Sequence, residues 1–136
     1  MELYEDCIIF LLAKAYQRVH AIHKELLRPY GLTAVQHLIL GALSIEDGQS
    51  AGEIGQKLVL DGATLSGTLD RMAGNGWISK GTDSADRRMV RISLTPKAKN
   101  LAQVLHAVRV GSNQKFLKHL SLEEKLLLKR LLKDLC

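Results

Sequence analysis

The chain has 136 residues, of which 46% are hydrophobic and 24% charged, proportions that are ordinary for one globular domain with a modest core. Its net charge of +5 favours a polyanionic partner, although an anionic membrane surface or an acidic protein would also match that charge. No apolar run approaches the ~20 residues that span a bilayer, and acidic residues stand where a signal peptide carries positive charge. We therefore expect a cytoplasmic protein with no membrane partner.

A long amphipathic helix is predicted over residues 4–29, because apolar residues recur there on one face. That face is Ile8, Leu12, Ala15, Val19, Ile22 and Leu26. Pro29 and Gly31 close the helix. Thr33 and Gln36 then form a capping box for a second helix, which we expect to reach Leu43 and to leave through the polar segment 46–49.

Two short helical patterns joined by a tight turn come next, an arrangement typical of a helix-turn-helix. Ser50 and Glu53 form a capping box, and Ile54 and Leu58 give the first helix an apolar stripe. After the turn at 59–62, a second helix is opened by Asp61 or Gly62 and stopped by the segment 74–76. Its inward face is predicted to be Leu65, Leu69 and Met72.

Small and hydroxylated residues occupy the opposite face of that second helix, which is therefore the candidate recognition helix. Such residues allow a helix N-terminus to approach base edges in a major groove. On this helix the expected DNA-contacting residues are Ala63, Thr64, Ser66, Gly67 and Arg71, and Asp70 also faces outward. Ser50, at the start of the first helix, is expected to contact DNA as well.

A β-hairpin, the wing, is predicted from strands at 77–80 and 89–94, with Val90, Ile92 and Leu94 facing inward. The connecting tip at 83–88 carries no large apolar side chain and so has no reason to pack. A positive tip beside a recognition helix suits the strongly negative minor groove. The expected DNA-contacting residues of the tip are Asp86, Arg87 and Arg88. We expect Asp86 to hold the Arg88 guanidinium in a bidentate pair.

The C-terminal segment is predicted to be two helices. Thr95 and Pro96 begin one that runs to about His119, and Ser121 caps the last one. The last helix carries Leu122, Leu126, Leu127, Leu131, Leu132 and Leu135. This leucine excess could fold back on its own chain or meet a second copy across a two-fold axis. We favour the second arrangement, because it also places two recognition helices ~34 Å apart, one turn of DNA.

Several of these segments resemble the signature of MarR-family transcriptional regulators, and the resemblance covers nearly the whole chain. The matching segments are Leu60-Asp61-Gly62-Ala63-Thr64-Leu65-Ser66, Leu69-Asp70-Arg71-Met72, Gly76-Trp77-Ile78, Asp86-Arg87-Arg88 and Leu94-Thr95. The resemblance implies a mainly α fold with a small β-hairpin: a winged helix-turn-helix at 33–95 and dimerisation helices at 1–32 and 96–136. It also implies a homodimer on a pseudo-palindromic operator, usually a repressor released by a small phenolic ligand or by oxidation.

The residues allow two kinds of effector site, one for a small molecule and one for a metal ion. We expect a small aromatic ligand in a pocket between the dimerisation helices and the DNA-binding region. Candidate polar lining residues are Tyr16, His20, Tyr30 and His37. A metal site at His20, His23 and His37 is an alternative, but polar surface or pocket lining explains these histidines more simply, and we expect no metal or other cofactor.

Cys7 offers a redox alternative, because a helix N-terminus lowers the pKa of a thiol. Residues 60–66 resemble most closely the organic-hydroperoxide-sensing branch of the family, whose sensor cysteine lies near the start of the first helix. Cys7 falls about two residues early for that role and Ala13 replaces the branch's tyrosine, so an inert thiol is favoured. Cys136 belongs to a frayed terminus, and no structural disulfide is expected.

Catalytic motifs are missing from the sequence. It contains no nucleophile elbow, no phosphate-binding glycine loop and no zinc-binding His-Glu-x-x-His helix, so we do not expect an enzyme. The competing hypotheses are an interaction module and a basic protein that coats DNA without sequence preference. Preference for one inverted repeat over random DNA by a factor of ~10³ or more would exclude the coating protein.

Overall fold

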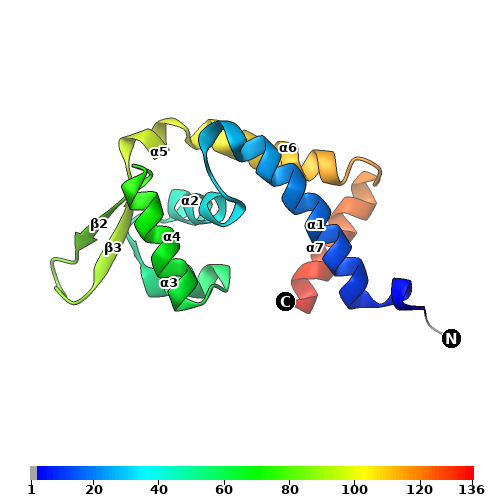
Figure 1. The fold of residues 1–136 in the computed structure, drawn as a ribbon, viewed down its shortest axis with the longest axis horizontal. Coiled ribbons are helices and arrows are strands. Elements are labelled where there is room, and N and C mark those ends of the chain that lie inside the picture. The colour runs from blue at the N-terminus through cyan, green and yellow to red at the C-terminus, as the bar shows by residue number, and fades with distance from the viewer. Residues whose placement is uncertain (1–2) are drawn as a thin grey trace. The chain divides into compact units, whose positions relative to one another are not determined.

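The computed structural model describes residues 3–136, which divide into two compact units, Leu27–Ala107 and the residues up to Leu26 together with Val108–Cys136 (Figure 1). The helices are α1 Ile8–Leu27, α2 Ala34–Ile45, α3 Ala51–Leu58, α4 Gly62–Gly74, α5 Pro96–Asn100, α6 Ala102–Phe116 and α7 Leu122–Leu135. Short 3-10 turns cover Tyr4–Asp6 and Arg28–Tyr30, and the strands are β1 Gln49–Ser50, β2 Ile78–Thr82 and β3 Val90–Leu94. The predicted fold class, mainly helical with a small hairpin, is confirmed.

Local capping explains where the helices begin. All three predicted capping boxes are present, at Thr33, Ser50 and Ser121. At the first of them the Gln36 amide N–H donates to Thr33 Oγ1 at 3.2 Å, while the Gln36 side chain accepts from the Thr33 amide at 3.0 Å. Each box satisfies backbone donors that a helix start leaves without partners, so the start sites follow from sequence alone.

The core of the unit Leu27–Ala107 forms where α2, α3, α4 and the sheet meet. Leu65, Leu69 and Met72 are buried, which confirms the predicted inward face of α4. Other fully buried side chains include Leu27, Ile39, Leu43, Ile54 and Ile92. His37 is also fully buried, with its Nε2 atom 2.8 Å from the Leu105 carbonyl oxygen. The candidate recognition helix α4 is thus anchored in the hydrophobic core through its buried face.

A third strand was missed by the sequence analysis. The sheet is antiparallel in the order β1-β3-β2, and β1 pairs Gln49 with Ile92 and Ser50 with Arg91. Gln49 was expected in a polar exit but only 1% of it is exposed. Its Nε2 donates to the carbonyl oxygens of Ala42, at 3.1 Å, and Glu46, at 2.6 Å. The amide nitrogen therefore supplies a donor to carbonyls at the C-terminal end of α2, although the amide oxygen Oε1 is buried without a hydrogen-bond partner among the described residues.

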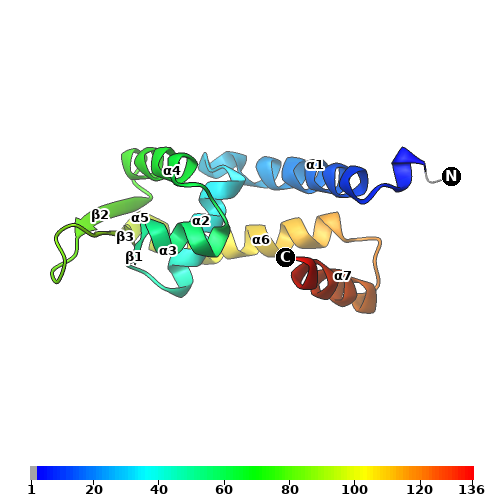
Figure 2. The same ribbon diagram turned by 90° about the horizontal axis from the view of Figure 1, so that it is seen from below.

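Three further expectations need correction. Val90 was expected to face the core but is 45% exposed, because it pairs with Thr82 at the outer end of the hairpin (Figure 2). Strand β2 continues two residues beyond the predicted end at Lys80, because its ladder with β3 runs on through Thr82. The predicted continuous helix after Thr95 is two helices, because Leu101 ends α5 with φ −96° and ψ 2°.

The second unit leaves much apolar surface exposed. Ile8 is 66% exposed and Leu12 48%, although both lie on the predicted apolar face of the first helix. On α7 the exposed fraction is 66% for Leu122, 60% for Leu126 and 44% for Leu131. Exposed apolar patches of this kind mark interaction surfaces.

Candidate nucleic-acid interface

The N-terminus of α4 is organised by one carboxylate. Asp61 Oδ1 accepts from the Thr64 amide and Oδ2 from the Thr64 hydroxyl, both at 2.8 Å. These two bonds hold the pKa of Asp61 below its ordinary value. With the apolar face of α4 packed inward, Ala63, Thr64 and Ser66 are exposed as predicted. The helix thus presents small and hydroxylated groups to solvent on a fixed backbone.

Arg71 supplies a cation further along the same face. It is exposed, and its Nη2 lies 3.4 Å from Thr68 Oγ1. A Cβ atom at Gly67 would lie 3.4 Å from Arg71 Nη1, so the glycine leaves room for the guanidinium. Thr68 is buried and donates to the Thr64 carbonyl at 2.8 Å, a packing role that sequence analysis missed. Asp70 forms an ion pair with Lys80 of β2, which ties α4 to the hairpin.

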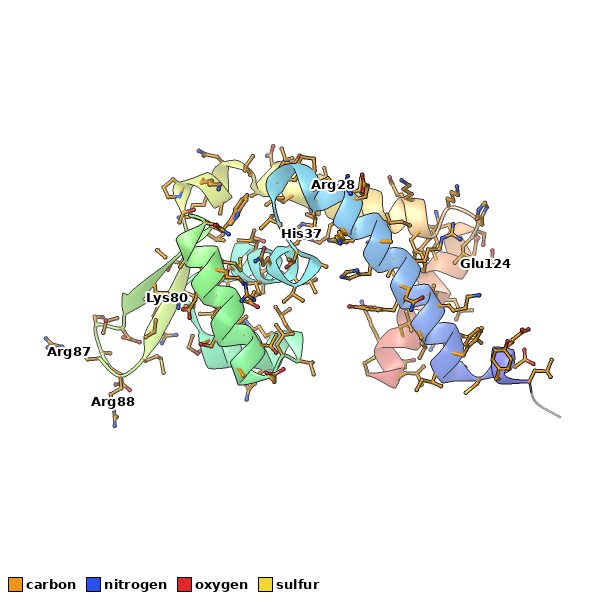
Figure 3. All side chains as sticks on the ribbon, viewed as in Figure 1. Arg28, His37, Lys80, Arg87, Arg88 and Glu124 are labelled. Carbon is orange, nitrogen blue, oxygen red and sulfur yellow. The ribbon has the colours of Figure 1, made fainter. Side chains whose placement is uncertain are left out.

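The wing tip consists of two side-chain turns in series. Asp83 Oδ1 accepts from the Ala85 amide at 2.7 Å, and Asp86 Oδ1 accepts from the Arg88 amide at 3.0 Å. Met89 closes the tip, since its carbonyl accepts from the Asp83 amide and its amide donates to the Asp86 carbonyl, both at 3.0 Å. Such turns restrict a short loop. Arg87 and Arg88 point away from the hairpin (Figure 3).

The predicted bidentate pair between Asp86 and Arg88 is wrong. Only Arg88 Nε approaches Asp86, at 3.4 Å, and the Arg88 side chain is 93% exposed. Asp86 Oδ1 is instead the acceptor for the Arg88 backbone amide, at 3.0 Å. The strong pair in the wing is Asp83 with Arg91, whose Nε and Nη2 lie 3.0 and 2.9 Å from Asp83 Oδ2.

The pair of Asp83 with Arg91 changes the proton affinity of both groups. The Ala85 amide and the Arg91 guanidinium hold the pKa of Asp83 below its ordinary value, and Asp83 raises the pKa of Arg91. Sequence analysis missed Arg91, which appeared only as one of the polar residues alternating along the second strand. Ser50, which was predicted to contact DNA, accepts through its Oγ from the Glu53 amide at 3.2 Å.

An open pocket of about 460 Å³ lies within the same unit, lined by residues of α3, α4 and the hairpin. Its lining includes Gly52, Gly55, Leu65, Ser66, Lys80 and Val90. The surface around the recognition helix is therefore concave, mostly apolar, and carries one ammonium group.

The predicted effector residues occupy different environments. Tyr16 and His20 on α1 have ring centroids 5.6 Å apart, and Tyr16 is 65% exposed. Tyr30 is half-buried, whereas His37 lies in the core described above. His23 Nδ1 lies 3.2 Å from Ser112 Oγ. Within residues 3–136 no group of three or more histidine, cysteine or acidic side chains could hold a metal ion.

Both cysteines are free and exposed. Cys7 directly precedes α1, and its carbonyl accepts from the Leu11 amide at 3.0 Å. In the part of the chain that the structure describes, no helix is long and apolar enough to cross a membrane.

The packed helix pair, the exposed face of α4 and the cationic hairpin together define a winged helix-turn-helix protein. The sequence profile of the MarR family matches residues 30–89. This segment, which holds the helix-turn-helix and most of the wing, therefore belongs to the MarR family.

Relatives and solved structures agree with this family. The regulator TtmR of Methylorubrum extorquens is 38% identical over 89 residues, which are 63% of this chain and 46% of TtmR, so the chain spans about half of that relative. A structure of BpsR from Bordetella bronchiseptica has a TM-score of 0.92, 27% identity, and coverage of 99% of this chain and 96% of that one.

A MarR mutant from E. coli, complexed with operator DNA, has a TM-score of 0.88 and 25% identity, with coverage of 99% of each chain. TtmR is a transcriptional regulator and the MarR mutant binds operator DNA, which agrees with the prediction that the chain is not an enzyme.

Proposed function

We propose that this chain is a transcriptional regulator that binds a pseudo-palindromic operator in double-stranded DNA as a homodimer and is released by a small aromatic ligand. The observation that carries the proposal is the exposed face of α4 beside a wing whose two arginines project into solvent. On this proposal α4 enters the major groove and Arg88 the adjacent minor groove. The likeness to the MarR mutant complexed with operator DNA supports this arrangement.

We propose different roles in DNA binding for the charged residues and for the small residues of α4. The net charge of +5 and the exposed Arg71, Arg87 and Arg88 supply phosphate and groove attraction. Thr64, Ser66 and Gly67 are proposed to read base edges, because small side chains permit close approach. The DNA-binding region at 33–95 lies within the unit Leu27–Ala107.

The proposed homodimer rests on the exposed apolar side chains of α1 and α7. A monomer in water would leave Ile8, Leu122 and Leu126 each at least 60% exposed. Helices within 1–32 and 96–136 are therefore proposed to pair across a two-fold axis. The two recognition helices would then meet successive major grooves on one side of the DNA.

A small-molecule effector is proposed because 6-hydroxynicotinic acid regulates the DNA binding of BpsR, whose fold this chain resembles. We propose Tyr16 and His20, whose rings lie together on α1, as its polar contacts, whereas His37 is fully buried with its Nε2 against the Leu105 carbonyl. We also propose a repressor as the mode of regulation. A ligand can release DNA only through its preference for the non-binding conformation of the dimer.

The test is selection of a duplex from a random library by the wild-type protein, followed by titration with variants. Arg88→Ala should weaken binding of the selected duplex by roughly 1–3 kcal/mol and lower the salt slope by about 1. Arg18→Ala, which removes the same charge from an exposed site on α1, is the matched control and should have little effect. Equal affinity of the wild type for selected and random DNA would indicate a coating protein instead.

A second mode of release uses Cys7, which is exposed immediately before α1. If Cys7 senses oxidant, organic peroxide should abolish operator binding, dithiothreitol should restore it, and Cys7→Ser should stay bound. If a ligand is sensed, aromatic carboxylates should lower DNA affinity equally in wild type and Cys7→Ser. We expect the second result.

A further inference from the structure

The Arg91 side chain joins three segments that are far apart in sequence. Arg91 lies on the central strand β3, where its backbone pairs with Ser50 and Gly81. Besides its bonds to Asp83, its Nη1 lies 3.4 Å from the Gly48 carbonyl oxygen and 3.6 Å from Glu53 Oε1. One guanidinium thus connects the base of the wing, the N-terminus of α3 and the turn before β1.

Asp83 links Arg91 to the backbone of the wing tip. Its Oδ2 accepts from Arg91 and its Oδ1 accepts from the Ala85 amide, so both carboxylate oxygens are used. The Asp83 side chain is only 15% exposed, against 93% for Arg88. The pair of Asp83 and Arg91 therefore fixes the base of the tip. Arg88, at the end of the tip, is held through its backbone amide, which donates to Asp86 Oδ1.

Surface ion pairs are individually weak, so a single contact would not support a functional role. Arg91 differs because a planar guanidinium with several bound partners fixes an orientation as well as a distance. Its donors point at protein oxygens, whereas the two arginines of the wing tip, Arg87 and Arg88, project into solvent.

We propose that Arg91 is a positioning residue for DNA binding: it fixes the wing tip relative to α3, and thereby places Arg88 for the minor groove without itself contacting DNA. The inference rests on the DNA-binding function proposed above. It extends that function by giving two arginines different roles: Arg88 contacts DNA, and Arg91 positions the wing tip that carries Arg88.

The first experiment uses a double-mutant cycle on the duplex selected by the wild type. Arg91→Lys keeps the charge but loses the planar fork, and should weaken binding roughly five- to tenfold, comparable to the loss of one groove contact. In an Arg88→Ala background the same substitution should cause no further loss, because the residue it positions is already missing. Additive losses would overturn the proposal and indicate a direct contact of Arg91 with DNA.

The second experiment measures amide hydrogen exchange in the free protein. Arg91→Lys and Asp83→Asn should each speed exchange in a peptide covering residues 82–90 by about tenfold, with α4 unchanged. Glu53→Gln should have a smaller effect, since glutamine keeps the capping box while the charge is lost. Arg88→Ala is the control and should leave exchange unchanged.

Unchanged exchange in Arg91→Lys would overturn the positioning role whatever the DNA result. If the wild type selects no duplex, the DNA-binding function fails and the exchange data still decide whether Arg91 fixes the tip. Melting curves of each variant establish that the rest of the chain remains folded.

Discussion

Val59 has a backbone conformation that its side chain disfavours. It ends α3 with φ 55° and ψ 52°, the left-handed region, and it is 89% exposed. A β-branched residue is strained there, whereas asparagine tolerates this region. The strain lies in the turn that leads into the recognition helix, and no burial of the side chain offsets it.

Val59→Asn should therefore stabilise the protein by about 0.5–1 kcal/mol, which chemical denaturation would measure. Val104→Asn is the matched control, because Val104 is 41% exposed but lies in the regular helix α6. That control should be neutral or slightly destabilising. A loss of stability in Val59→Asn would mean that the valine makes a favourable contact in the turn.

His23 makes stability depend on pH. Burial, the Arg109 guanidinium and His20 lower the pKa of His23 below its ordinary value of 6.5. The unfolded chain therefore binds a proton at a pH where the folded chain does not. The contribution of neutral His23 is present above pH 6.5 and is lost as the pH falls below that value.

We expect a lower melting temperature at a pH of about 5.5 than at about 7.5, and a smaller difference in His23→Gln. His106→Gln, an exposed site on α6, is the control and should keep the wild-type difference. The same pH dependence in wild type and His23→Gln would assign it to other groups.

At the scale of elements, the junction between α2 and β1 depends on one amide. Gln49 Nε2 donates to the carbonyls of Ala42 in α2 and of Glu46, the residue that caps its C-terminus, and in the adjoining segment Asp47 Oδ1 accepts from the Leu94 amide at 2.9 Å. The segment 46–49 therefore connects a helix end to the central strand.

Gln49→Ala should cost about 1–3 kcal/mol, because it removes the donor to the Glu46 carbonyl and one of the two donors to the Ala42 carbonyl. Gln49→Glu should cost more, since it sets a carboxylate against carbonyl oxygens. Gln17→Ala, at an exposed site on α1, should stay within about 0.5 kcal/mol of wild type. Denaturation midpoints measure all three, and equal midpoints for Gln49→Ala and Gln17→Ala would contradict the capping role.

At the scale of the whole molecule, the proposed dimer predicts coupled losses. Leu131→Asp should abolish both the dimer and operator binding, because a carboxylate in an apolar interface must be desolvated. Leu38→Asp is the matched control: Leu38 is 48% exposed and Leu131 44%, but Leu38 lies on α2 outside the proposed interface. Sedimentation at micromolar concentration should give a dimer for Leu38→Asp and a monomer for Leu131→Asp. A wild-type monomer that binds the operator tightly would refute this arrangement.

The features that depend on near neighbours along the chain could be predicted from the sequence. The capping boxes at Thr33, Ser50 and Ser121 join residues three apart, and the periodicity of Leu65, Leu69 and Met72 orients the recognition helix. The hairpin and its unpacked arginine tip follow from strand alternation and local turn residues in the same way.

The features whose partners are distant in the chain could be seen only in the folded protein. Arg91 meets the Gly48 carbonyl across 43 positions, and His37 meets that of Leu105 across 68. The strand at Gln49 exists only because β3 offers it an edge. Periodicity shows that a residue is buried or outward, but it cannot name the partner, because that partner is brought close by the fold and not by the local chain.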